Sequence, residues 1–196
     1  MCVVSDTSMK ELVIPEERYT ESKKWFEKRD WDSINGRILI YPFDSKNLGL
    51  FSYDLCIGNE AFSIRTKSKI LISKEKDAVI EPDDVCLVLT NEYIGLPRDY
   101  AGSVMPRFLL VRKGIMQSMT KIDPTWCGKI AVAIINFSGK PFKLTYNHPF
   151  CTLVLHKLDK PSSKILNLRD TPALGKESIE YFLKIGEEAK TRGCLR

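Results

Sequence analysis

Hydrophobic residues in the middle of the chain fall in short runs, separated by turn-forming Gly, Pro, Asn and Asp residues. Runs of this kind, rich in Val, Ile, Leu, Tyr and Thr, predict β-strands. The predicted strands are residues 37–40, 52–57, 69–72, 85–90, 102–105, 129–136, 142–145 and 152–155. Many short strands with turns between them favour a β-sandwich or barrel over units in which strands and helices alternate.

The pattern before residue 37 predicts a different structure. Residues 20–31 contain strong helix formers, and Thr20 is a candidate N-cap, so we expect a short helix there. Residues 1–19 show no clear period and predict a loose or docked tail.

A second helix is predicted near the C terminus. Pro172 suits its first turn, with Thr171 as the cap. Ile179, Phe182 and Leu183 then fall on one face, which is typical of a packing surface. We therefore expect three parts: an N-terminal tail and helix over residues 1–36, a β domain over residues 37–160, and a linker with a C-terminal amphipathic helix over residues 161–196.

Composition narrows the class of protein. A chain of 196 residues with 43% hydrophobic and 28% charged residues is typical of one soluble globular domain. The formal net charge is +5, but no block of five like charges occurs, so a nucleic-acid partner is not expected. No apolar run approaches the length of a membrane span.

The six cysteines are scattered and form no Cys-x-x-Cys pair. Because only His148 and His156 are available as imidazole ligands, no metal site is expected. Scattered thiols without a secretory leader predict a reducing, cytoplasmic location.

Four motifs occur in a fixed order along the predicted β domain. Residues 52–58 read Ser-Tyr-Asp-Leu-Cys-Ile-Gly, and residues 89–102 contain Thr-x-Glu, Leu-Pro and Ala-Gly. Residues 107–112 begin and end with Arg, and residues 123–128 read Asp-Pro-Thr-Trp-Cys-Gly. In this order the motifs resemble the dCTP deaminase and dUTP pyrophosphatase family, especially its deaminase branch, over about residues 37–158.

The resemblance implies a mainly β fold, a distorted β-barrel or jelly-roll of the dUTPase-like type, with a short helix at the N terminus and another at the C terminus. It also implies a homotrimer with sites for a deoxynucleoside triphosphate between subunits. No tightly bound cofactor is implied, and Mg²⁺ would accompany the nucleotide if the protein is active. The resemblance identifies no protein partner.

The same resemblance implies site residues. Arg107 and Arg112 match the two arginines of the family's Arg-Ser-Ser-Leu-Ala-Arg segment, and a planar guanidinium suits phosphate oxygens. The serines between them are Phe108 and Leu109, which cannot donate hydrogen bonds. Asp123 matches the aspartate that lies against the deoxyribose, and its carboxylate could accept the 3′-hydroxyl or act as a base.

Other family positions carry different residues here. Ala133 occupies the position of the glutamate that activates water in the deaminases, and a methyl group cannot carry a proton. Thr152 replaces a glutamine and Cys56 replaces an arginine, although Asp54 remains.

These differences leave three hypotheses: a catalytically degenerate family member that keeps at most nucleotide binding, an active deaminase or pyrophosphatase, and an interaction module. If the protein is active, groups outside the matched motifs would have to contribute, and Glu92 and Lys121 are the first polar residues to consider.

Several of these residues also have plain structural interpretations. Arg107 and Arg112 could form ion pairs at a subunit interface, and Asp123 could stabilise a turn. Asp54 is expected to be largely structural, Trp126 to pack in the interior, and Cys127 to be unreactive.

Overall fold

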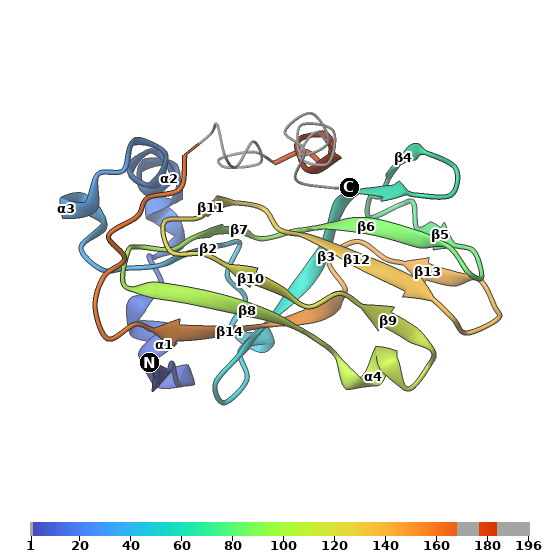
Figure 1. Ribbon diagram of the computed structural model, residues 1–196, viewed down its shortest axis with the longest axis horizontal. Helices are drawn as coiled ribbons and strands as arrows, with labels where there is room; N and C mark the ends of the chain where they lie inside the picture. Colours follow the sequence, from blue (N-terminus) through green and yellow to red (C-terminus); the bar gives the residue numbers. More distant parts are fainter. Residues whose placement is uncertain (1, 168–176, 184–196) are drawn as a thin grey trace.

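The structure is a computed structural model that describes residues 2–167 and 177–183. A nine-stranded antiparallel sheet forms most of the molecule, and it curls along its length (Figure 1). Its strand order is β10-β8-β14-β3-β6-β12-β9, with β1 added to β14 and β4 added to β3. Two small sheets, β11-β7-β2 and β13-β5, complete the β structure.

The strands are β1 Cys2–Val3, β2 Leu39–Tyr41, β3 Tyr53–Ser63, β4 Ser68–Leu71, β5 Ala78–Ile80, β6 Val85–Thr90, β7 Tyr93–Gly95, β8 Tyr100–Pro106, β9 Ile115–Gln117, β10 Thr120–Ile122, β11 Cys127–Gly128, β12 Ala131–Asn136, β13 Phe142–Leu144 and β14 Pro149–Lys157. The helices are α1 Asp6–Leu12, α2 Tyr19–Lys28, α3 Trp31–Ile34 and α4 Phe108–Val111, with 3-10 turns η1 Glu16–Arg18 and η2 Ser45–Asn47.

Alternation of buried and half-exposed residues explains why these segments are strands. In β12, Val132, Ile134 and Asn136 are buried, whereas Ala131 and Ala133 are partly exposed. This period of two places every second side chain in the core. All eight predicted strands are present, and the mainly β prediction is confirmed.

The predicted N-terminal helix is present but shorter, and it begins one residue before Thr20. Arg29 ends α2 in a left-handed conformation at φ 62°, and Asp30 then caps α3 by accepting the N–H of Ser33. The prediction therefore merged two helices, because Arg29 is not a residue type that usually marks a helix end. Gly95 in β7 lets Phe26 of α2 pack closely, since a Cβ atom there would lie 2.9 Å from the Phe26 ring.

Residues 2–19 are docked on the sheet, so of the two predicted alternatives, a loose or a docked tail, the docked one is observed. Ser5 caps α1 through its hydroxyl, Met9 of α1 is fully buried, and β1 pairs with the end of β14. Seven helical residues give less than two turns, which is too short to show a period in the sequence.

The predicted start of the C-terminal helix, at Thr171 and Pro172, lies outside the described residues. Residues 180–183 are helical, and Ile179 before them is fully buried. The Glu60 carboxylate of β3 accepts hydrogen bonds from the Ser178 hydroxyl and the Ile179 N–H, which attaches this segment to the sheet. The division of the chain at residues 36 and 160 stays a prediction.

No helix among residues 2–167 and 177–183 is long and apolar enough to cross a membrane. Five cysteines lie in this part of the chain, and none of them forms a disulfide. Among the same residues, no group of three or more His, Cys, Asp or Glu side chains is arranged to hold a metal ion.

Candidate functional site

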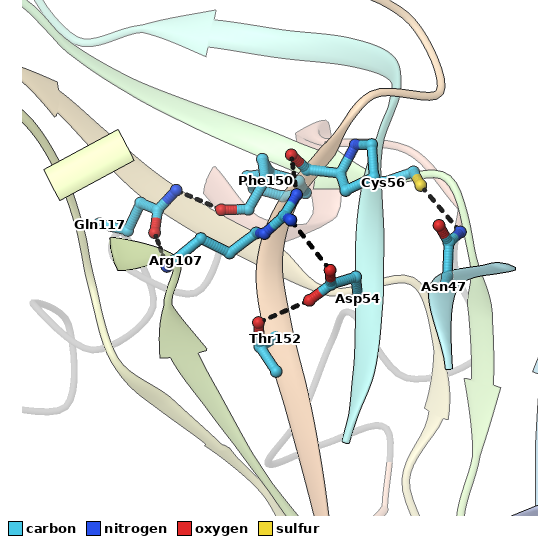
Figure 2. A network of polar contacts seen from close by, with 8 residues as sticks. Asn47, Asp54, Cys56, Arg107, Gln117, Phe150 and Thr152 are labelled. Atoms are coloured by element: carbon cyan, nitrogen blue, oxygen red, sulfur yellow. Dashed lines mark hydrogen bonds and ion pairs between the residues drawn. The ribbon is translucent and has the colours of Figure 1, made fainter. Parts of the chain in front are cut away.

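Arg107 stands at the end of β8 in a network of polar contacts (Figure 2). Its backbone N–H donates to the Gln117 side-chain oxygen at 2.8 Å, and its guanidinium donates to the Pro149 carbonyl at 2.9 Å. The guanidinium also forms an ion pair with Asp54 at 3.1 Å, and Asp54 accepts the Thr152 hydroxyl at 2.7 Å. Arg107 therefore joins β8, β9, β14 and β3.

Two sequence interpretations are tested by this network. Asp54 is structural, as expected, and Arg107 makes a structural ion pair within its own chain. Thr152, at the position of the family's glutamine, completes the network from β14. A guanidinium carries five N–H donors, so Arg107 keeps donors for a ligand, and its part in phosphate binding stays a prediction.

The residues after Arg107 are open to solvent. Phe108 is 75% exposed and Leu109 is 53% exposed, although α4 holds both at the tip of the sheet. Arg112 at the end of α4 is exposed; its backbone N–H donates to the Phe108 carbonyl, but its side chain makes no hydrogen bond or ion pair with the part of the chain that the structure describes. The apolar replacements therefore do not fill a pocket of their own chain.

Ala133 lies close to the Arg107 network. Ile134, the next residue, pairs with Gln117 of β9, which also holds the Arg107 backbone. The N–H of Ala133 donates to the Ser118 hydroxyl at 3.1 Å, and Ser118 returns its own N–H to the Ala133 carbonyl. The structure thus brings together the arginine segment and the position of the deaminase glutamate, and it adds Ser118, which the sequence analysis did not identify.

Asp123 lies at the other end of the sheet. Ile122 pairs with Gly102 of β8, and Arg107 lies five residues after Gly102, directly beyond the end of that strand. At about 3.3 Å per residue, this separation is about 17 Å. In Figure 1, β10 runs beside β8 and away from α4, which follows the opposite end of β8. One copy of the chain therefore does not bring Asp123 to Arg107 and Ala133.

The surroundings of Asp123 agree with both of its predicted roles, stabilising a turn and offering a carboxylate to a ligand. Its carbonyl accepts the Trp126 N–H at 3.2 Å, so it does form the turn. Its carboxylate is nevertheless partly exposed and receives the Lys121 ammonium at 2.5 Å and 2.7 Å. Asp123 also lines a pocket of about 370 Å³ together with Ser162, Lys164 and Leu166 of the segment after β14.

Glu92 is an interior residue rather than part of this surface. It is 1% exposed, and its carboxylate accepts the backbone N–H of Cys56 at 2.9 Å. Burial raises the pKa of the Glu92 carboxyl to about 7. Trp126 is buried with its indole N–H on the Gly128 carbonyl, so the packing interpretation is confirmed, and Cys127 is buried as well.

Comparison with known proteins agrees with the sequence motifs. The model of the dCTP deaminase-like family matches residues 27–158, more than half of the chain. A dCTP deaminase of Pyrococcus horikoshii is 37% identical over 133 residues, which cover 67% of this chain and 83% of that protein. A dUMP-forming dCTP deaminase of Methanopyrus kandleri is 28% identical over 151 residues, covering 66% of this chain and 78% of that one.

A solved structure is also similar. The 2′-deoxycytidine 5′-triphosphate deaminase of Agrobacterium tumefaciens superposes with a TM-score of 0.56 at 15% identity, covering 79% of this chain and 48% of that chain. At this identity the likeness supports the fold, which is of the predicted dUTPase-like type. With a family model over residues 27–158 and relatives above 30% identity, the chain belongs to the dCTP deaminase-like family.

Proposed function

We propose that the protein is an active enzyme that takes dCTP and replaces the amino group of its cytosine ring with oxygen from water, giving dUTP and ammonia. The observation that carries the proposal is the relationship to proteins named dCTP deaminase, at 37% identity over two thirds of the chain. This relationship favours activity over the degenerate enzyme expected from the site residues alone.

The geometry supports a site shared between two copies of the chain. Arg107 and Ala133 lie at one end of the sheet and Asp123 at the other, about 17 Å away along β8. A second copy can supply the missing end, and a closed ring of three copies would repeat the same interface three times. The homotrimer is part of this proposal.

Arg112 is the side chain best placed to hold the triphosphate. Its guanidinium is exposed and has no competing partner among the described residues, whereas Arg107 is committed to Asp54 and Pro149. Phe108 and Leu109 add no hydrogen bonds, so the two arginines and the Mg²⁺ that accompanies the nucleotide would neutralise the phosphates. The weaker hydrogen bonding predicts a higher Kd for dCTP than serines would give.

Proton transfer has to come from a group other than residue 133. Within the shared site, the Asp123 carboxylate of the second copy is the partly exposed acid, it forms an ion pair with Lys121, and we assign it the role of base. Ser118 lies beside Ala133 and can hold a water molecule or the ring by a hydrogen bond.

A second reaction is favoured by one specific observation. Because Ala133 carries no acid while Asp123 is kept, the site also suits hydrolysis of the triphosphate, with Asp123 orienting the attacking water. That reaction releases pyrophosphate and leaves a nucleoside monophosphate with its base unchanged.

The test follows products by chromatography after incubation of the protein with dCTP or dUTP and Mg²⁺. Deamination converts dCTP to dUTP, and hydrolysis releases pyrophosphate with dCMP or dUMP. Asp123→Asn should lower either rate about 100-fold or more. Asp32→Asn, an exposed aspartate on α3, is the matched control and should leave the rate unchanged. If neither dCTP nor dUTP is turned over, the protein is a catalytically degenerate member of the family.

A further inference from the structure

A second pocket, of about 290 Å³, lies between α2, the small sheet β11-β7-β2 and the turn after β13. The residues that matter here are Tyr19, Tyr41, Asn91, Lys129, Tyr146 and Glu177. None of them lines the Asp123 pocket or contacts Arg107. The pocket is therefore separate from the site proposed for dCTP.

Aromatic rings form a rigid wall of this pocket. Tyr19 of α2 and Tyr41 of β2 stack with ring centroids 3.6 Å apart and planes 13° apart. Tyr93 meets the Tyr19 ring edge-on at 6.2 Å, and the Lys23 ammonium lies over the Tyr93 ring at 4.9 Å. Rings fixed by several neighbours offer flat apolar surface to a planar ligand at little entropic cost.

Lys129 brings to the same pocket a positive charge that no acidic side chain contacts directly, although Glu177, Glu92 and Glu60 attract it from a distance. Its side chain is half-buried at the end of β11, and it forms no hydrogen bond or ion pair with residues 2–167 or 177–183. Burial lowers the pKa of the Lys129 ammonium. Lys23 and Lys69, by contrast, are paired with Glu177 and Glu60. A half-buried ammonium without a partner is costly, and an anion placed on it would lower that cost.

The remaining polar groups are held in fixed positions. The Tyr146 hydroxyl donates to the Asn91 side-chain oxygen at 3.1 Å, and the Asn91 amide donates to Asn147 at 3.0 Å. Glu177 is engaged by Lys23, so it does not neutralise Lys129 by direct contact. Among the described residues that line this pocket, Lys129 is therefore the cationic side chain that can bind a ligand.

We propose that this pocket binds a small planar anion, a single aromatic or heteroaromatic ring with one acid group. The acid group would contact Lys129, and the ring would lie against the Tyr19–Tyr41 stack. The volume lies just below the usual range for ligand pockets, which suits one ring with an acid group better than a nucleoside triphosphate.

The test is titration of the full chain with three probes, benzoate, orotate and the neutral benzamide, followed by calorimetry or by NMR of the protein. Benzoate and orotate should bind at least about tenfold more tightly than benzamide, because the ion pair contributes only for the acids. Lys129→Met should weaken the acids about tenfold or more and leave benzamide unchanged. Lys24→Met, an exposed lysine of α2, is the matched control and should change nothing.

Lys129→Arg keeps the positive charge, so this variant should still bind benzoate and orotate more tightly than benzamide. It shows whether the loss in Lys129→Met comes from the charge or from any substitution at this position. Equal binding of benzoate and benzamide, full affinity in Lys129→Met, or no binding by any probe up to about 10 mM would overturn the proposal. These outcomes do not depend on dCTP turnover, so failure here leaves the proposed function standing, and the reverse also holds.

Discussion

At the scale of single residues, burial changes the chemistry of Glu92. The Glu92 carboxylate accepts the backbone N–H of Cys56, and the Lys129 ammonium attracts it from a distance. Desolvation then dominates and raises the Glu92 pKa to about 7.

The raised pKa predicts a dependence of stability on pH. Between about pH 4.5 and pH 7 the folded protein keeps a proton on Glu92 that the unfolded chain releases. The free energy of unfolding should therefore fall by about 3 kcal/mol as pH rises through this window, and level off above it. Glu92→Gln imitates the protonated acid, so its chemical denaturation curves should lack this contribution. An identical pH slope in wild type and Glu92→Gln would contradict the assignment.

The Arg107–Asp54 ion pair makes a second prediction at this scale. Asp54→Asn keeps an acceptor for Thr152 but removes the charge, so unfolding should become easier by about 1.5–3 kcal/mol. Asp77→Asn breaks an exposed contact of 3.9 Å with Lys143 and should cost less than about 1 kcal/mol. Urea denaturation of both variants measures the difference, and equal costs would show that the network around Arg107 is not stabilising.

At the scale of elements, the long buried strands were predictable, whereas of the three-residue strands β2 and β13 were predicted and β5, β7, β9 and β10 were not. The strands β3, β6, β8, β12 and β14 carry hydrophobic runs that the sequence shows directly. In contrast, β7, β9 and β10 have only three residues each, and their pairing depends on neighbours brought by the fold. The helix α1 was missed for the same reason, since its stability comes from docking rather than from its own length.

Docking of α1 is testable through Met9, which is fully buried in the core. Met9→Ala should lower the free energy of unfolding by about 2–5 kcal/mol, because it removes buried surface and leaves a cavity. Met119→Ala is the matched control, since Met119 is 67% exposed, and it should have little effect. Thermal or urea denaturation compares the two. A Met9→Ala variant as stable as the control would mean that α1 does not pack on the sheet in solution.

At the scale of the whole molecule, the matched residues divide into two groups at opposite ends of one sheet. The motifs alone indicated which residues belong to the family pattern, but not that Arg107, Ser118 and Ala133 lie together while Asp123 lies apart. That separation follows from the antiparallel pairing of β8 with β10, a register that no local pattern in the sequence specifies. Under the proposed function, the complete site is therefore formed by two copies of the chain.

Complementation between two inactive variants tests this account most directly. Arg112→Ala and Asp123→Asn, each alone, should have little dCTP turnover. Co-expressed in equal amounts, they should form mixed rings in which about one quarter of the interfaces have both native residues, and about a quarter of the wild-type rate should return. Mixed protein as inactive as either parent, with wild type active and all samples equally oligomeric, would contradict a site shared between copies.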